Sequence, residues 1–469
     1  MNAEMRGEKD FPTSGKSLIF LVVGPVLGAF LFFIMKSFGW GSDACWTAAV
    51  STVCSIWWVS ESIPIPVTSL LPFVLFPALG VLSPGEIGES YGAPLVLLLL
   101  GGLMLSTAMA GSGAHRRLAL VMVNFFGGSS NRRLVFGFMA ASAVLSMWIS
   151  NTATTLMMLP VALAVLEKSD DKSLTVPLLL GIAYAASVGG IGTPIGTPPN
   201  LVFSEIYFQN TGVEISFFTW MIWAVPVVVI FLPIIALYLT RNLRGSGGFV
   251  MPEAGQWSSH ETRVLAVFLI TAVTWMTRSE PFGGWKTWFG VPGANDAGVA
   301  LAAVIVMFIV PNGKGGRLLD WDTASSIPWG ILILFGGGIA IAKAFMTSGL
   351  SMALGAVLSG LGVLHIVLIL AIACLAITFL TELTSNTATT TLVMPILAAT
   401  AMAMDIEPAL LMVPAAMSAS CAFMLPVATA PNVVVFSAGA FSTKVMAREG
   451  LALNFIGVLI ITAVCAIMF

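Results

Sequence analysis

Long runs of apolar residues recur along the whole chain and restrict its fold more than any other feature. Three of them read LIFLVVGPVLGAFLFFIM, APLVLLLLGGLMLSTAMA and FTWMIWAVPVVVIFLPIIALYL. As helices, runs of about 18 residues or more are long enough to cross the hydrocarbon core of a bilayer. Charged residues make up 9% of the chain, whereas soluble proteins carry about 25%. The sequence therefore predicts an all-α, polytopic membrane protein.

The positions of the basic residues predict the topology. We expect the first helix to start in the cytoplasm, followed by about eleven full spans in all and two short re-entrant hairpins. The N-terminus is then cytoplasmic and the C-terminus lies outside the plasma (inner) membrane. This topology satisfies the positive-inside rule, because it places 16 of the 20 lysines and arginines on the cytoplasmic side: Arg6, Lys9, Lys16, Arg116, Arg117, Arg132, Arg133, Lys168, Lys172, Arg241, Arg244, Arg263, Lys314, Arg317, Lys444 and Arg448.

The chain also repeats itself at long range. Three pairs of similar segments keep the same order and a nearly constant separation; they begin at Pro94 and Pro328, at Ser150 and Ser385, and at Gly196 and Ala428. The predicted topology gives the two halves opposite orientations, and inverted repeats are typical of secondary transporters. We therefore predict an N-terminal segment and first helix (1–39), a first repeat (40–240), a cytoplasmic linker (241–261) and a second repeat (262–469).

The hexapeptide SNTATT occurs twice within apolar segments, in SMWISNTATTLMMLP and in TELTSNTATTTLVMP. Serine, asparagine and threonine favour helix ends over helix interiors, and lipid tolerates such a break only where protein or water surrounds it. Each motif is therefore predicted to form the tip of a re-entrant hairpin, at about 133–168 and 363–401. The hydroxyls of Ser146 and Ser150, and those of Thr381 and Ser385, are four positions apart and are expected on one helical face. Such oxygens suit a small hard cation, and free N–H groups after the break suit an anion.

Two further segments, GGIGTPIGTPPNLVF and LPVATAPNVVVF, place glycine and proline where a helix must unwind. They predict broken helices at about 174–207 and 408–440. One such break would be consistent with a packing kink. Two breaks and two SNT tips at corresponding positions favour a binding site near the middle of the membrane. By contrast, LLLLGGLML and LILFGGGIA are predicted to be close helix contacts.

These motifs resemble those of the divalent-anion:sodium symporters, a family of sodium-coupled dicarboxylate, citrate and sulfate carriers. The resemblance covers nearly the whole chain and rests on the paired SNT motif with GTPPN and ATAPN. It implies a homodimer of scaffold domains and a transport domain that carries the hairpins and moves as an elevator. It also implies sodium-coupled import of a small dianion, first of all a C4-dicarboxylate such as succinate, malate or fumarate, with sulfate or citrate as alternatives. Sodium is the expected coupling ion, with no organic cofactor and no nucleic-acid partner.

Carried onto this chain, the resemblance implies two sodium sites and one substrate site. One sodium is expected at Ser146, Ser150, Asn151 and the Gly196 carbonyl, and the other at Thr381, Thr384, Asn386 and the Ala428 carbonyl. The substrate carboxylates are expected at Asn151, Thr152, Asn386 and Thr387, with Thr197 and Thr429 nearby. One departure is Ala430, which stands where GTPPN has Pro198 and is expected to loosen one wall of the pocket.

The charge pattern agrees with coupling to a cation. Neither motif segment contains arginine, and Lys343 is the only basic residue expected at depth. A dianion would meet amides, hydroxyls and helix N-termini, so bound sodium would have to supply the positive charge. Glu382 lies three residues before Ser385; it either supports the hairpin through hydrogen bonds or acts directly on cation affinity. Glu61, in SESIPIP, is expected at a cytoplasmic turn.

Other classes of membrane protein fit the sequence less well. A channel would need a continuous polar pore. A cation/proton antiporter would need pairs of buried acids at the breaks, and a membrane enzyme would need a nucleophile with a base. The five cysteines and three histidines are scattered, so no metal site beyond sodium is predicted.

Overall fold

A computed structural model of the chain describes residues 15–126, 130–169, 171–243, 255–353 and 365–469. Within these ranges the chain is helical with no β-strand, so the prediction of an all-α fold is confirmed. Three of the basic residues used for the topology (Arg6, Lys9 and Arg244) lie outside the described residues. So do most of the predicted linker and the first residues of the second predicted hairpin.

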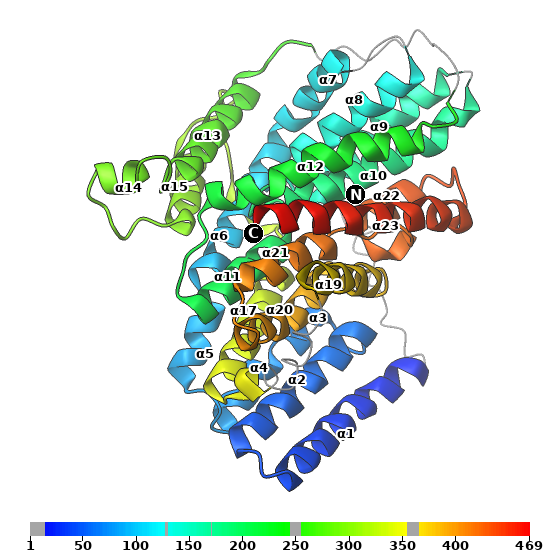
Figure 1. The fold of residues 1–469 in the computed structure, drawn as a ribbon. Helices are drawn as coiled ribbons and strands as arrows, with labels where there is room; N and C mark the ends of the chain where they lie inside the picture. Colours follow the sequence, from blue (N-terminus) through cyan, green and yellow to red (C-terminus); the bar gives the residue numbers. More distant parts are fainter. Residues whose placement is uncertain (1–14, 127–129, 170, 244–254, 354–364) are drawn as a thin grey trace.

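The first half of the chain runs from α1 to α12 (Figure 1), with these bounds: α1 (Gly15–Ser37), α2 (Ser42–Ser60), α3 (Ile65–Thr68), α4 (Leu71–Ala78), α5 (Pro84–Tyr91), α6 (Pro94–Ser112), α7 (Ala114–Phe126), α8 (Asn131–Ser146), α9 (Asn151–Glu167), η1 (Lys172–Leu174), α10 (Thr175–Ile191), α11 (Pro198–Thr211) and α12 (Phe217–Leu239).

The second half continues with α13 (Ser259–Met276), α14 (Gly284–Trp288), α15 (Asp296–Ile309), α16 (Trp321–Ser325), α17 (Trp329–Thr347), α19 (Ile366–Thr381), α20 (Asn386–Ala403), α21 (Pro408–Ala419), η3 (Pro426–Ala428), α22 (Ala430–Phe436) and α23 (Thr443–Met468). In Figure 1, α1 and α2 lie at one end of the molecule, and α13 to α15 project from its upper left.

Local sequence explains where several helices begin and end. The Ser216 side chain accepts a hydrogen bond from a first-turn N–H of α12, and Ser258 forms a capping box with Glu261 at the start of α13. Gly113 and Gly212 end α6 and α11 in the left-handed conformation, which glycine adopts without steric cost.

The length of the helices is compatible with a membrane. Among the described residues, six helical stretches are long and apolar enough to cross one: Leu18–Ser37, Pro84–Ser112, Lys172–Ile191, Phe217–Leu239, Trp329–Thr347 and Thr443–Met468. Five shorter apolar helices accompany them. Because α8–α9, α10–α11 and α19–α22 consist of interrupted pieces, helix length alone does not recover the predicted eleven spans, which stay a prediction.

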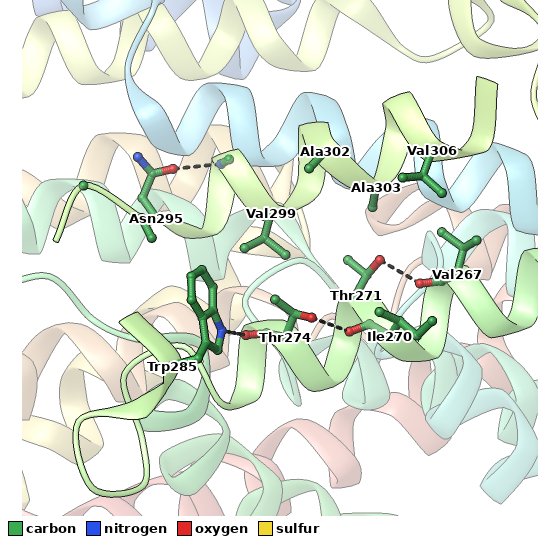
Figure 2. Close-up of a pocket in the computed structure, with 13 residues that line it drawn as sticks. Val267, Ile270, Thr271, Thr274, Trp285, Asn295, Val299, Ala302, Ala303 and Val306 are labelled. Carbon is green, nitrogen blue, oxygen red and sulfur yellow. Dashed lines mark hydrogen bonds between the residues drawn. The ribbon is translucent and has the colours of Figure 1, made fainter. Parts of the chain in front are cut away.

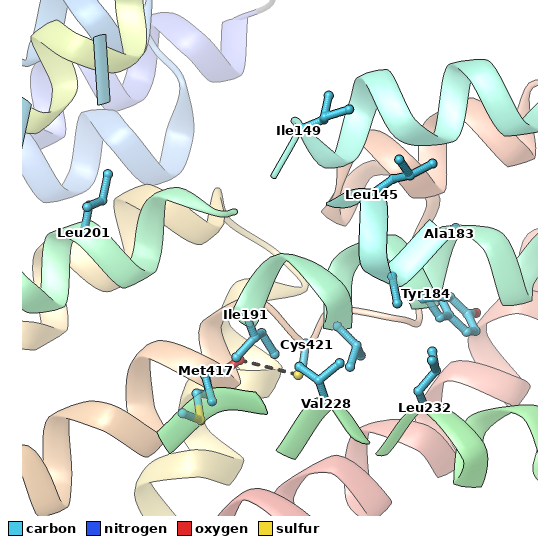
Figure 3. Packing of buried hydrophobic residues seen from close by; sticks show 14 of the residues in the cluster. Leu145, Ile149, Ala183, Tyr184, Ile191, Leu201, Val228, Leu232, Met417 and Cys421 are labelled. Atoms are coloured by element: carbon cyan, nitrogen blue, oxygen red, sulfur yellow. Dashed lines mark hydrogen bonds between the residues drawn. The ribbon is translucent and has the colours of Figure 1, made fainter. Parts of the chain in front are cut away.

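Helix α10 lies at the centre of the largest core, where every residue from Pro177 to Ile191 is buried. It packs closely on α8, because a Cβ at Gly189 would lie 2.3 Å from the Ala143 carbonyl oxygen. Figure 3 shows Leu145 of α8 and Ala183 and Tyr184 of α10, which belong to this core. This packing fixes the end of α8 beside the end of α10, the two places where the chain breaks.

The glycine-rich runs that were predicted to be helix contacts are confirmed as such. A Cβ at Gly101 would lie 2.6 Å from the Ala300 Cβ, and one at Gly337 would lie 2.5 Å from the Ser69 carbonyl oxygen. Gly102 differs from its neighbours, because it also lines the central cavity described below.

Candidate functional site

Among the described residues, two cavities with volumes of several hundred Å³ differ in their linings. A groove of about 490 Å³ lies between α13 and α15 (Figure 2), and its described lining contains no charged residue. The hydroxyls of Thr271 and Thr274 donate to the carbonyls of Val267 and Ile270 in their own helix, at 2.8 and 2.7 Å. The Trp285 indole donates to the Thr274 carbonyl at 2.9 Å. These hydrogen-bond donors are already paired within the protein, so the groove offers an anion few free donors.

The second cavity has a volume of about 810 Å³ and lies where several helices begin. Its described lining contains no lysine or arginine. It does contain every residue predicted to bind the substrate: Asn151, Thr152, Thr197, Asn386, Thr387 and Thr429. We refer to it as the central cavity.

The central cavity collects helix N-termini. Ser150 precedes α9, Thr197 precedes α11 and Ser385 precedes α20, and all three line the cavity. The first N–H groups of a helix have no partner within the helix and carry a partial positive charge. Such ends favour anions without needing a basic side chain.

At the first SNT motif, oxygen atoms converge on one side-chain amide. One terminal atom of the Asn151 amide lies 2.5 Å from Ser146 Oγ and 3.3 Å from each of the Ala186 and Gly196 carbonyl oxygens. A nitrogen at this position donates to all three atoms. Rotation of the amide would instead bring a fourth oxygen to the same point, and such a group of oxygens would suit a small cation. Ser150 lies beside them and caps α9 by accepting from Ala153 N at 3.2 Å.

At the second SNT motif, the Thr381 side chain takes the place of Ser146. Its Oγ1 lies 2.7 Å from Asn386 Oδ1 and 2.9 Å from the Ala419 carbonyl oxygen. A hydroxyl has a single proton to donate, so one of these two contacts lacks a hydrogen. Thr384 and Ala428 also line the cavity, and the Thr384 hydroxyl contacts the Leu380 carbonyl oxygen at 3.0 Å and the Thr389 hydroxyl. The arrangement again suits a small cation.

The prediction that paired hydroxyls share a helical face is wrong. Ser146 is the last residue of α8 and Ser150 precedes α9; likewise, Thr381 ends α19 and Ser385 precedes α20. The helix breaks between the members of each pair because the polar side chains there pair with backbone and amide groups instead of continuing the helix. Ser146 and Thr381 face Asn151 and Asn386, rather than the hydroxyl four positions on.

The unwound segments opposite the SNT motifs are held by buried asparagines that the sequence analysis did not single out. Asn200 Nδ2 donates to the carbonyls of Gly190, Ile191 and Thr193 at 3.0, 3.3 and 2.7 Å. Asn200 and Asn432 are the last residues of GTPPN and ATAPN, and these two motifs were the sequence signal that could have identified them.

The bonds of Asn432 repeat the pattern in the other half. Its Nδ2 donates to the Ala422 and Leu425 carbonyls, each at 3.0 Å. Both asparagines are fully buried. They stabilise the interrupted backbone that leads to the Gly196 and Ala428 carbonyls, because unpaired backbone groups would be costly there.

Glu382 supports the second hairpin through hydrogen bonds. Its Oε1 accepts from the Phe423 and Met424 N–H groups at 2.6 and 2.8 Å and from Asn454 Nδ2 at 2.8 Å. Its Oε2 accepts from Leu425 N at 3.0 Å. Of the two roles left open by the sequence, the structure assigns the supporting one.

Two other residues lie where the sequence alone did not place them, and a third lies in the pocket wall as expected. Glu61, expected at a cytoplasmic turn, ends α2 and lines the central cavity. Lys343, expected at depth, pairs with Glu89 at 3.0 Å and is not in the cavity lining. Ala430 begins α22 and lines the cavity, as Pro198 does at the start of α11.

The interrupted helices and the cavity between them define a polytopic helical membrane transporter. The fold is similar to the crystal structure of the Alcanivorax borkumensis YdaH transporter, with a TM-score of 0.62 over 82% of this chain and 88% of that one. The two chains share 15% identity, so this likeness concerns the fold alone.

Sequence comparison narrows the class to one family. The model of the citrate transporter family matches residues 55–413. The chain is also 38% identical to the sodium-dependent dicarboxylate transporter SdcS of Staphylococcus aureus strain USA300, over 98% of this chain and 92% of that protein. SdcS of strain NCTC 8325 gives the same values. The chain belongs to this family of carboxylate transporters, which are not enzymes, and the resemblance identified from the motifs is confirmed.

Proposed function

We propose that the protein is a sodium-coupled symporter that imports a small divalent anion, first of all a C4-dicarboxylate such as succinate, malate or fumarate. One observation carries the proposal: the described lining of the central cavity has no basic residue, while an oxygen cluster lies at each SNT motif. Two carboxylates in such a cavity need positive charge from elsewhere. The name of the SdcS relatives, sodium-dependent dicarboxylate transporter, supports the same assignment.

In this proposal each SNT motif serves a cation on one side and a carboxylate on the other. Sodium binds at Ser146, Ser150, Asn151 and the Gly196 carbonyl, and again at Thr381, Thr384, Asn386 and the Ala428 carbonyl. The carboxylates contact Asn151, Thr152, Asn386 and Thr387, with Thr197 and Thr429 nearby. Sodium next to each helix N-terminus adds charge to the partial charge of the backbone N–H groups.

The proposed architecture is a pair of inverted repeats, 40–240 and 262–469, each with a re-entrant hairpin and a broken helix. Matching hydrogen bonds support it. Thr155 Oγ1 donates to the Asn151 carbonyl at 2.8 Å, and Thr390 Oγ1 donates to the Asn386 carbonyl at 2.7 Å. We propose further that the chain forms a homodimer, moves by an elevator mechanism, and has its N-terminus in the cytoplasm and its C-terminus outside.

Two alternatives share parts of this geometry. A sodium-coupled sulfate or citrate carrier would use the same cavity. The match to the citrate transporter family supports citrate as an alternative substrate. A cation/proton antiporter would need a buried acid free to exchange protons. Both oxygens of the buried Glu382 carboxylate already accept hydrogen bonds, which disfavours that role.

Uptake by proteoliposomes tests the proposal. Labelled succinate should accumulate when an inward sodium gradient is imposed and should not when choline replaces sodium. Unlabelled sulfate and citrate, added separately as competitors, rank the alternative substrates. Equal succinate uptake in sodium and in choline would rule out sodium coupling.

A further inference from the structure

One carboxylate that lines the central cavity has no side-chain partner among the residues that the structure describes. Glu61 is exposed and lines the cavity. Within the described part of the chain, no hydrogen bond or ion pair involves its side chain. Glu382, the other acidic residue of the described lining, accepts four hydrogen bonds. Glu61 therefore contributes an uncompensated negative charge to a cavity proposed to bind anions.

The backbone at Glu61 is also unusual. Its φ of 48° and ψ of 35° place it in the left-handed region at the end of α2. Glycine usually occupies this position at a helix end because it has no Cβ. A glutamate there bears a conformational cost, and such outliers cluster at functional sites.

The cavity offers a third carboxylate no basic partner. Its described lining has no lysine or arginine, and the amides and hydroxyls proposed to hold a dianion belong to the SNT motifs and to the segments with Thr197 and Thr429. Much of the remaining lining is apolar, with Leu99, Leu103 and Ile331 among it, and with Leu383 and Val427, which are 74% and 81% exposed. A carboxylate left without a donor bears the cost of desolvation.

We propose that Glu61 sets the charge of the accepted substrate, by repelling tricarboxylates more strongly than dicarboxylates. This inference rests on the proposed function and deepens it. A cavity of about 810 Å³ is large enough for a drug-sized ligand, so size does not separate a four-carbon from a six-carbon acid. Charge does separate the two kinds of acid, because repulsion by a fixed carboxylate grows with every negative charge on the ligand.

The test measures how the effect of removing the charge depends on ligand charge. The ligands are monomethyl succinate, succinate and propane-1,2,3-tricarboxylate, with one, two and three negative charges at pH 8. Their affinities for the purified protein are measured by thermal shift and calorimetry in saturating sodium. Their inhibition of labelled succinate uptake is measured in parallel. Wild type is compared with Glu61→Gln, and with Glu61→Asn in case the first variant folds poorly.

We expect Glu61→Gln to increase affinity by about fivefold per negative charge on the ligand, as repulsion across a partly hydrated cavity predicts. The tricarboxylate should therefore gain about fivefold relative to succinate. Glu61→Asp, which keeps the charge, should restore the wild-type order. Glu167→Gln is the matched control, because Glu167 is exposed at the end of α9 and outside the cavity lining.

Two results would overturn the inference. The first is an equal change in affinity for all three ligands, which would indicate that the substitution alters the shape of the cavity. The second is an altered half-saturating sodium concentration with the ligand ratios unchanged, which would place Glu61 in a cation site. The binding measurements do not depend on transport. A failure of sodium-dependent uptake would therefore refute the proposed function, while the affinities of the three ligands would still test the role of Glu61.

Discussion

Replacing Thr381 by valine should weaken sodium binding and leave the fold intact. The Thr381 side chain is fully buried, and its hydroxyl lies 2.7 Å from Asn386 Oδ1 and 2.9 Å from the Ala419 carbonyl oxygen. Valine has nearly the same size but no oxygen. A polar contact to a charged group contributes about 1.5–3 kcal/mol. The half-saturating sodium concentration for succinate uptake should therefore rise by about tenfold to a hundredfold.

The stability cost should be smaller than the binding cost. Thr381 donates one hydrogen bond, so the variant should lose about 1 kcal/mol of unfolding free energy. Thr381→Ser keeps the hydroxyl and should keep sodium affinity near that of wild type. Thr378→Val is the matched control, since Thr378 lies one turn earlier in α19, is buried, and has no hydrogen-bond partner for its hydroxyl in the described structure.

The assay is succinate uptake by proteoliposomes over a sodium titration, with thermal shifts in sodium and in choline as a binding measurement free of transport. If Thr381→Val keeps the wild-type sodium dependence, the oxygen cluster at the second SNT motif does not bind sodium. The same conclusion follows if Thr378→Val weakens sodium binding as much as Thr381→Val does.

Two further predictions follow from the same geometry. Asn151→Ala and Asn386→Ala should each abolish succinate uptake, because each amide contacts an oxygen cluster and faces the central cavity; normal uptake by either folded variant would exclude that half from the site. Sodium should bind before the substrate and order each break, so linkage requires sodium and succinate to raise each other's affinity by the same factor. Calorimetry should find succinate affinity rising with sodium concentration, and a flat profile would contradict this order. Single cysteines at Thr154 or Thr389, both buried, should accordingly react faster with thiol reagents in choline than in sodium.

The sequence by itself determined the class of fold and the chemistry of the motifs. Apolar runs long enough to cross a bilayer require helices, because lipid cannot satisfy unpaired backbone groups. The duplicated SNTATT and the segments around GTPPN and ATAPN predicted where helices are interrupted, because the preferences of serine, asparagine, glycine and proline are local. The residues that the family resemblance implied for the substrate all line one cavity.

Only the tertiary structure decided which groups face one another across the cavity. The carbonyls of Ala186 and Ala419 lie beside the SNT motifs, yet every residue has a carbonyl, so no sequence pattern distinguishes these two. Glu61 reads as a turn residue and lies in the cavity wall because of how α2 packs against the rest of the chain. Contacts between residues far apart in sequence depend on the close packing of whole helices, as at Gly189 against Ala143. Local residue preferences determine where a helix is interrupted, whereas helix packing determines which groups lie opposite the interruption.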